Sequence, residues 1–295
     1  MNDKPALQPG LAVGEALRAV ARDILREARA AIEDPANSDA VAVHEFRQAM
    51  KRWRALLRML EPFLPDEDRQ LRVEAGDVAR SLTGARDAQS ALDALNDLAA
   101  HGLALSPRSL AKLRGRIEAL RQSAETVVLT ADMRLRMADV LAQAEAAVDR
   151  WTLHVLTFAE VADRLTLGFR KARRALPRSW SDAEPDDLHE LRKRVVAHRY
   201  QMETVEPLWP RFGRMWVGEA QRLRERLGRH QDLTLLAALT QPHRPLAPWR
   251  SRLAPAIAQR MKDHVARSRR IAARLFVEKP NAFRRRLKVI WETGG

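Results

Sequence analysis

Apolar side chains recur every three or four residues along almost the whole chain. This spacing places them on one face of an α-helix, and no segment shows the strict alternation that is typical of half-buried strands. The pattern therefore predicts an all-α protein. The expected helices cover residues 11–33, 40–61, 66–101, 107–148, 151–176, 186–206, 210–240, 247–277 and 281–292.

Several of these boundaries carry recognisable start and stop residues. A residue that precedes proline is disfavoured in the α conformation, so helices are expected to end before Pro62 and Pro207. Pro185 suits the first turn of a helix. Ser38 or Asp39 is expected to cap the helix that begins near residue 40.

The chain also resembles itself at an offset of 145 residues. The matching positions are His44-Glu45-Phe46-Arg47 with His189-Glu190-Leu191-Arg192, Arg54 with Arg199, Glu61-Pro62-Phe63-Leu64-Pro65 with Glu206-Pro207-Leu208-Trp209-Pro210, Leu82 with Leu227, and Asp87 with Asp232. One residue out of register, Arg26 and Arg29 match Arg170 and Arg173. Residues 11–148 and 151–292 are therefore predicted to be two copies of one helical bundle, related by a pseudo-twofold axis.

The segment 44–60 combines two stripes on opposite faces of one expected helix. The apolar stripe consists of Phe46, Met50, Trp53, Leu57 and Leu60. The basic stripe lies two positions back, about 200° around the helix, and consists of His44, Arg47, Lys51, Arg54 and Arg58. Its successive side chains rise by roughly 5 Å, a spacing along which a chain of phosphates could lie.

The second copy keeps the apolar stripe and weakens the basic one. The basic positions read His189, Arg192, Val196, Arg199 and Glu203, with Lys193, Arg194 and His198 nearby. Most charge runs are simply solvated helix faces. However, no acid interrupts the first stripe between Arg47 and Arg58, although surface helices usually mix signs for pairing at i,i+4. That lack of acids favours an anion-binding face.

Composition agrees with an anionic partner. The 295 residues carry 52 Lys and Arg against 38 Asp and Glu, a net charge of +14, and 44 of the 52 basic residues are Arg. The planar guanidinium binds phosphate oxygens in pairs, so this excess suits a phosphate polymer, although a GC-rich genome would also favour Arg. The chain has no cysteine, no apolar run long enough to span a bilayer and no secretory signal, so a cytoplasmic protein without membrane association is expected.

Further basic residues lie outside the two stripes. The helix before the second stripe is crowded with Arg164, Arg170, Lys171, Arg173 and Arg174. Residues 255–295 hold 11 Lys and Arg against three acids, and Arg260, Arg267 and Arg274 share one helix face. Either these residues add contacts to an anion, as Arg26 and Arg29 are also candidates to do, or the tail is a capping helix with a solvated outer face.

No catalytic constellation emerges from the sequence. His44 and His189 are open to three interpretations: a metal site, an acid/base or phosphoacceptor role, or hydrogen bonding within a basic groove, of which the last is favoured. Asp87 and Asp232 are expected to pair with basic residues in a structural role. With no glycine-rich phosphate loop and no acidic cluster for Mg²⁺, we expect no catalytic residue, no metal and no cofactor.

These motifs resemble those of the CHAD family, the conserved histidine α-helical domains. The family signature opens His-x-x-Arg and continues with Arg or Lys every three or four residues. It is matched by His44, Arg47, Lys51, Arg52 and Arg54, and in the second half by His189, Arg192, Lys193, Arg199 and Tyr200. The Leu-Gly-x-x-x-Asp element near Asp87 and Asp232 is also similar, and the resemblance spans about residues 11–290. Val196 and Ala197 depart from the usual Lys or Arg, and no Glu-x-Glu-x-Lys motif of a fused triphosphate tunnel domain is present.

The resemblance implies two four-helix subdomains around a basic central groove or pore that binds inorganic polyphosphate without catalysis, and association with polyphosphate granules. Besides the His, Arg and Lys residues of the two matched sets, Arg58, Arg170 and Arg173 are expected to contribute. Non-specific nucleic-acid binding remains one alternative, because a net charge of +14 attracts any polyanion. An enzyme acting on phosphoanhydrides is a second. Chain-length preference and oligomeric state stay open.

Overall fold

The computed structural model describes residues 5–7, 10–82, 86–124 and 129–293, and this part of the chain is helical throughout, without strands. The helices are α1 (Val13–Glu33), α2 (Asp39–Leu60), α3 (Asp68–Ser81), α4 (Arg86–Ala99), α5 (Pro107–Ala124), α6 (Ala131–Arg150), α7 (Phe158–Arg174), α8 (Pro185–Val205), α9 (Pro210–Leu239), α10 (Arg250–Leu275) and α11 (Pro280–Thr293), with short 3₁₀ turns at Glu61–Phe63, Glu206–Leu208 and Ala247–Trp249. The predicted all-α class is confirmed.

The larger hydrophobic core joins two groups of helices. Helices α1, α2, α3 and α6 pack together, and α7 packs against α8 and α11 while α8 packs against α9. Contacts of α2 with α7 and α8 connect the two groups. Trp53 of α2 is fully buried in this core and stacks on Trp151 with ring centroids 5.8 Å apart.

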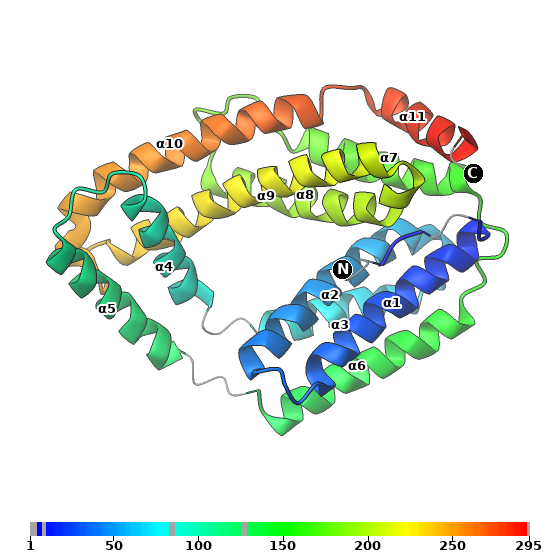
Figure 1. Ribbon diagram of the computed structural model, residues 1–295, viewed down its shortest axis with the longest axis horizontal. Coiled ribbons are helices and arrows are strands. Elements are labelled where there is room, and N and C mark those ends of the chain that lie inside the picture. Colours follow the sequence, from blue (N-terminus) through cyan, green and yellow to red (C-terminus); the bar gives the residue numbers. More distant parts are fainter. Residues whose placement is uncertain (1–4, 8–9, 83–85, 125–128, 294–295) are drawn as a thin grey trace.

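A second, smaller core lies at the other end of the molecule, where α4 and α5 pack together and α4 lies against α9 and α10 (Figure 1). Its buried residues are Ala91, Leu92, Ala94, Leu95, Leu98, Leu113, Ile117, Leu233, Leu236, Leu246, Leu253 and Ile257. Residues from both predicted halves therefore share this core, and α4 and α5 are not part of the bundle formed by the rest of the first half.

Three predicted helix boundaries are corrected by the structure. The expected helix 66–101 is two helices, since α3 packs on α2 and α6 whereas α4 packs on α5 and α9. The expected helix 107–148 is likewise α5 and α6, and Thr130 caps the start of α6 by accepting from the Met133 N–H. The helix expected from residue 151 begins only at Phe158, because Thr157 and Glu160 form a capping box there.

The structure confirms the local reading of α2 and of the first turn of α8. The Ser38 side chain caps α2 by accepting from the Val41 N–H, and Pro185 stands in the first turn of α8. The predicted apolar stripe of α2, Phe46 to Leu60, is at most 3% exposed. Burial of this stripe orients the opposite face of α2 away from the core.

The last two turns of α8 are buried on all sides although they are largely polar. His198 is 1% exposed and lies among Phe169, Trp216 and Phe283, where its Nε2 accepts a hydrogen bond from Trp216 Nε1 at 3.0 Å. Burial lowers the pKa of His198 to about 3. This imidazole is therefore neutral at ordinary pH.

We expect acid to destabilise the protein through His198. The unfolded His binds a proton below about pH 6.5, but the folded one does so only near pH 3, so stability falls as the pH drops through this window. Denaturant unfolding at pH 4.5 should give a free energy roughly 2 kcal/mol below that at pH 7 from this residue. His198→Asn, which keeps an acceptor for Trp216, should flatten the profile, whereas the same change at exposed His154 should not. An unchanged profile in His198→Asn would contradict the assignment.

Candidate functional site

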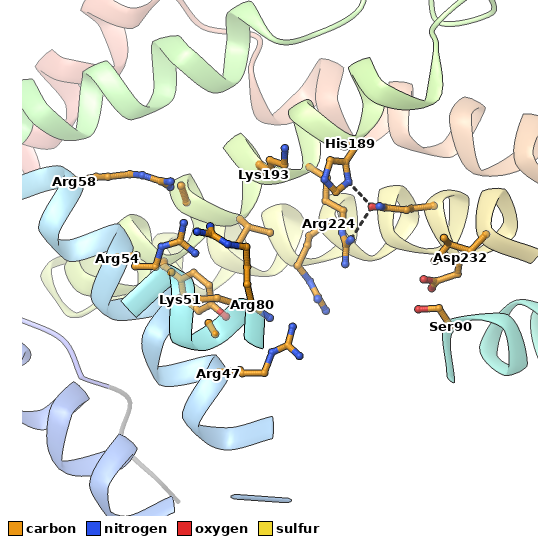
Figure 2. A pocket seen from close by; sticks show the side chains of 18 residues that line it. Arg47, Lys51, Arg54, Arg58, Arg80, Ser90, His189, Lys193, Arg224 and Asp232 are labelled. Carbon is orange, nitrogen blue, oxygen red and sulfur yellow. Dashed lines mark hydrogen bonds between the residues drawn. The ribbon is translucent and has the colours of Figure 1, made fainter. Parts of the chain in front are cut away.

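A cavity of about 590 Å³ lies between α2 and α3 on one side and α8 and α9 on the other. Its lining is Arg47, Lys51, Arg54, Arg58, Gly76, Ala79, Arg80, Ser90, His189, Arg192, Lys193, Val196, Ala197, Tyr200, Arg224, Gln231, Asp232 and Leu235. Among these described residues are eight Lys and Arg but only one carboxylate, so the lining carries seven net positive charges with His189 neutral. Figure 2 shows the α2 cations facing His189, Lys193 and Arg224, with Asp232 and Ser90 at one end.

Helix α2 supplies half of the cations. Arg47, Lys51, Arg54 and Arg58 all line the cavity, because the opposite face of the helix is held in the core. Arg47 Nη1 donates to the carbonyl of Leu82 at 2.8 Å, which holds this guanidinium near the end of α3. The four side chains form a row along the helix, as their spacing predicts.

Arg54 and Arg58 are half-buried, and their side chains form no hydrogen bond or ion pair with the residues that the structure describes. Burial lowers the pKa of Arg54, and repulsion from Arg80 and Arg72 lowers it further. The pKa of Arg58 is lowered in the same way, by burial first and then by Arg54. Both groups remain charged at neutral pH, so the cavity concentrates positive charge at a cost to the free protein.

Glycine lets the Arg54 guanidinium lie flat against α3. A Cβ at Gly76 would come within 3.3 Å of Arg54 Cζ. Gly228 of α9 has the same relation to Arg192, with a Cβ position 3.4 Å from Nη2. Each glycine thus leaves room for a guanidinium between two helices.

On the facing wall, one glutamine side chain positions the side chains of Arg192 and His189. Gln231 Oε1 of α9 accepts from Arg192 Nη1 at 3.0 Å and lies 2.6 Å from His189 Nδ1. The His189 ring therefore presents its Nε2 away from Gln231. Lys193 Nζ lies 3.4 Å from Oε2 of Glu190, which belongs to the same helix.

Some lining residues were not among the sequence candidates. Arg80 comes from α3, Arg224 and Gln231 from α9, Tyr200 from α8 and Ser90 from α4. None belongs to a periodic basic run, and only the fold brings them together. Asp232, for which a structural role was expected, also lines the cavity, while the Asp87 side chain lies outside the described residues.

Five predicted site residues do not line the cavity. His44 lies at the exposed start of α2, where its Nε2 is 2.9 Å from Gln48 Nε2. Arg52 points to the opposite side and pairs with Glu27 of α1 at 2.5 Å. Arg199 forms a buried ion pair with Glu203 at 2.8 Å.

The other two belong to α7. Arg173 Nε donates to the carbonyl of Phe276 at 3.0 Å, just after α10, and thereby ties α7 to that turn. Arg170 is half-exposed on the same helix. Neither side chain lines the cavity.

The additional basic candidates are also placed elsewhere, and all but one pair with carboxylates. Arg26 pairs with Asp23, Arg29 with Glu33 and Glu145, Arg260 with Asp97, and Arg274 with Glu219. Arg267 of α10 is half-exposed and repels Arg226 of α9. These side chains link helices or face solvent outside the cavity.

Asp97 of α4 is the centre of a buried polar cluster that joins α4 to α10. Arg260 grips its carboxylate with two hydrogen bonds of 2.7 and 2.8 Å, and His264 Nε2 lies 2.8 Å from Oδ2. Burial alone would raise the pKa of Asp97, but the hydrogen bonds from Arg260 and His264 outweigh it and hold the pKa well below its usual value. A second cavity of about 440 Å³ beside this cluster shares Asp232 with the first.

Two negative findings apply to the described residues alone. They contain no group of three or more His, Asp or Glu side chains arranged to hold a metal ion. None of their helices is both long and apolar enough to cross a membrane.

The described residues thus form an all-α protein with a cavity that is lined by eight Lys and Arg side chains. The family model of the CHAD domain matches residues 15–241, so the chain belongs to the CHAD family. A crystal structure of the CHAD domain from the plant Ricinus communis matches with a TM-score of 0.57 and 20% identity, over 96% of this chain and 94% of that chain. The likeness to that structure shows the fold. No curated protein matches the chain in sequence.

Proposed function

We propose that the protein binds inorganic polyphosphate in the cavity between α2, α3, α8 and α9. The observation that carries this proposal is the convergence of eight Lys and Arg side chains, six of them Arg, around a single carboxylate. Such a charge excess is costly in the free protein and favourable once phosphate oxygens enter.

A linear polymer suits the shape better than a small anion does. The α2 row alone runs from Arg47 to Arg58, eleven residues or roughly 16 Å of helix. One phosphate can reach only part of that row. Seven net positive charges correspond to about seven singly charged phosphate units in the cavity.

An internal duplication accounts for the two-sided cavity. Shifted back by 145 residues, the bounds of α7, α8 and α11 fall within those of α1, α2 and α6. Under this interpretation residues 11–148 and 151–292 are the two copies, and the cavity forms where their equivalent helices α2 and α8 meet. Val196 and Ala197 then replace cations of the second copy, and Arg80 and Arg224 supply charge from the neighbouring helices.

The proposed role is that of a non-enzymatic binding module that attaches to polyphosphate granules in the cytoplasm. Nucleic acid is the second candidate ligand for the cavity. Tyr200 is the only aromatic residue among the described lining residues, so the cavity offers little stacking surface for bases. This composition favours a polymer that has no bases.

Affinity should rise with chain length and then level off. Chains of up to about seven phosphates should gain affinity with each added unit. In longer chains the cavity is already filled, so affinity should rise only because more segments of the chain can occupy it. Calorimetric titration with polyphosphates of defined length, repeated from 50 to 300 mM salt, measures both the plateau and the salt slope. Binding that is independent of length and of salt would rule out the cavity as a polyphosphate site.

A further inference from the structure

Helix α10 carries a strongly basic outer face that is separate from the cavity. Its 26 residues include eight Lys and Arg and a single acid, Asp263. The helix lies at the edge of the molecule, where it packs on α9 and, more lightly, on α4 (Figure 1). No residue of α10 lines the cavity.

Two cations of α10, the buried Arg260 and the exposed Arg274, are paired with acids of neighbouring helices, and several others are not. Arg260 is held by Asp97, and Arg274 pairs with Glu219. Five further cations of α10 are exposed, and their side chains form no ion pair or hydrogen bond with the described residues: Arg250, Arg252, Lys262, Arg269 and Arg270. Asp263 does not compensate them, since its carboxylate is hydrogen-bonded to Gln259 at 3.1 Å and lies 3.8 Å from Arg260.

Several exposed arginines on other helices are paired with acids. Arg22 pairs with Asp149 at 2.8 Å, Arg26 with Asp23 at 2.8 Å, and Arg69 with Asp66 at 3.1 Å. These faces mix charges, although exposed arginines such as Arg116 and Arg136 likewise form no side-chain ion pair or hydrogen bond with the described residues. The outer face of α10 lacks this mixing.

The arrangement of the unpaired cations around and along the helix fits phosphates that are held at fixed positions. Arg252, Lys262, Arg269 and Arg270 lie within about 100° of one another around the helix and extend over roughly 27 Å. The surface is convex and exposed, so it cannot enclose a flexible chain as a cavity does. An α-helix of this kind matches the major groove of a duplex, which is about 12 Å wide and flanked by phosphates from both strands.

We propose that the outer face of α10 binds the backbone of a nucleic-acid duplex, independently of the cavity. The helix contains no Phe, Tyr or Trp, so neither base stacking nor a preference for single strands is expected. Contacts to phosphates alone carry no sequence information, so binding should be independent of sequence.

The test compares two sets of variants with two probes. Lys262→Gln/Arg269→Gln/Arg270→Gln should weaken binding of a 20-base-pair DNA duplex about tenfold or more at low salt and reduce the salt slope by about 3. The same variant should bind long-chain polyphosphate like the wild type. The matched control Arg22→Gln/Arg26→Gln/Arg69→Gln removes the same charge from paired positions and should retain most duplex binding.

Each other outcome is decisive. If the α10 variant binds the duplex as the wild type does, or if the wild type binds no duplex, the proposal is wrong. If the α10 variant loses polyphosphate but keeps the duplex, the surface binds a second polyphosphate chain instead. If the cavity variant Lys51→Gln loses the duplex more strongly than the α10 variant, the duplex lies at the cavity. If Lys51→Gln retains polyphosphate while the α10 variant loses the duplex, the proposed function fails and the α10 surface stands.

Discussion

Lys51→Glu/Arg54→Glu should weaken polyphosphate binding by about 100-fold or more while leaving the fold intact. Both side chains line the cavity. The double change replaces two cationic hydrogen-bond donors for phosphate oxygens by two carboxylates that repel the ligand. Each lost charge-assisted hydrogen bond is worth about 1.5 to 3 kcal/mol, so two of them amount to the expected loss in affinity. The measurement is a calorimetric or fluorescence titration, with circular dichroism to establish that the helices persist.

Two neighbouring positions on α2 provide the matched control. Lys51 lines the cavity, whereas Arg52 faces α1 and pairs with Glu27. Lys51→Gln and Arg52→Gln remove one charge each within one residue of each other, so their effects on the long-range field are nearly equal. Lys51→Gln should weaken binding clearly more than Arg52→Gln does. Equal losses would mean that net charge, and not the cavity, determines affinity.

Asp97→Asn should lower the free energy of unfolding by about 3 to 5 kcal/mol. The Asp97 side chain is 7% exposed and that of Arg260 4%, and the change leaves the buried guanidinium without its counter-charge. Since Asp97 joins α4 to α10, the smaller core around Leu95 and Leu253 should open first. Urea unfolding gives the loss, and hydrogen exchange of α4 and α10 amides locates it.

A double variant separates loss of the pair from loss of packing. Arg260→Met removes the stranded charge and keeps most of the side-chain volume, so Asp97→Asn/Arg260→Met should be more stable than Asp97→Asn alone. Asp263→Asn changes an acid of α10 whose side chain is 43% exposed, and it should cost little. If the single variant Asp97→Asn is as stable as the wild type, the cluster contributes nothing to stability.

The sequence is sufficient to predict what depends on local periodicity. The spacing of Phe46, Met50 and Trp53 predicts which face of α2 is buried, and the opposite stripe consequently predicts four of the cavity cations. His189 and Arg192 follow from the match at an offset of 145, and Lys193 follows from the resemblance to the CHAD signature. These positions need no knowledge of distant partners.

Residues whose role depends on a distant partner were not predictable in this way. From its spacing along the helix alone, Arg260 is expected to be a surface cation. In the structure it forms a buried pair with Asp97, which lies 163 residues away in the sequence. Gln231 carries no charge, so no basic pattern includes it, although it orients His189 and Arg192. Arg199 is different, because Glu203 lies one helical turn further on and the sequence itself shows that acid.

The half-buried guanidinium groups of Arg54 and Arg58 make the free protein less stable than its core allows. Binding of the proposed polyanion would offset that cost, and by mass action it would add about 2.7 kcal/mol of stability when the ligand is at 100 times its dissociation constant. The amount of folded, protease-resistant protein in a cell should therefore follow the supply of its ligand. The cavity would act in this way as a sensor whose output is the lifetime of the protein.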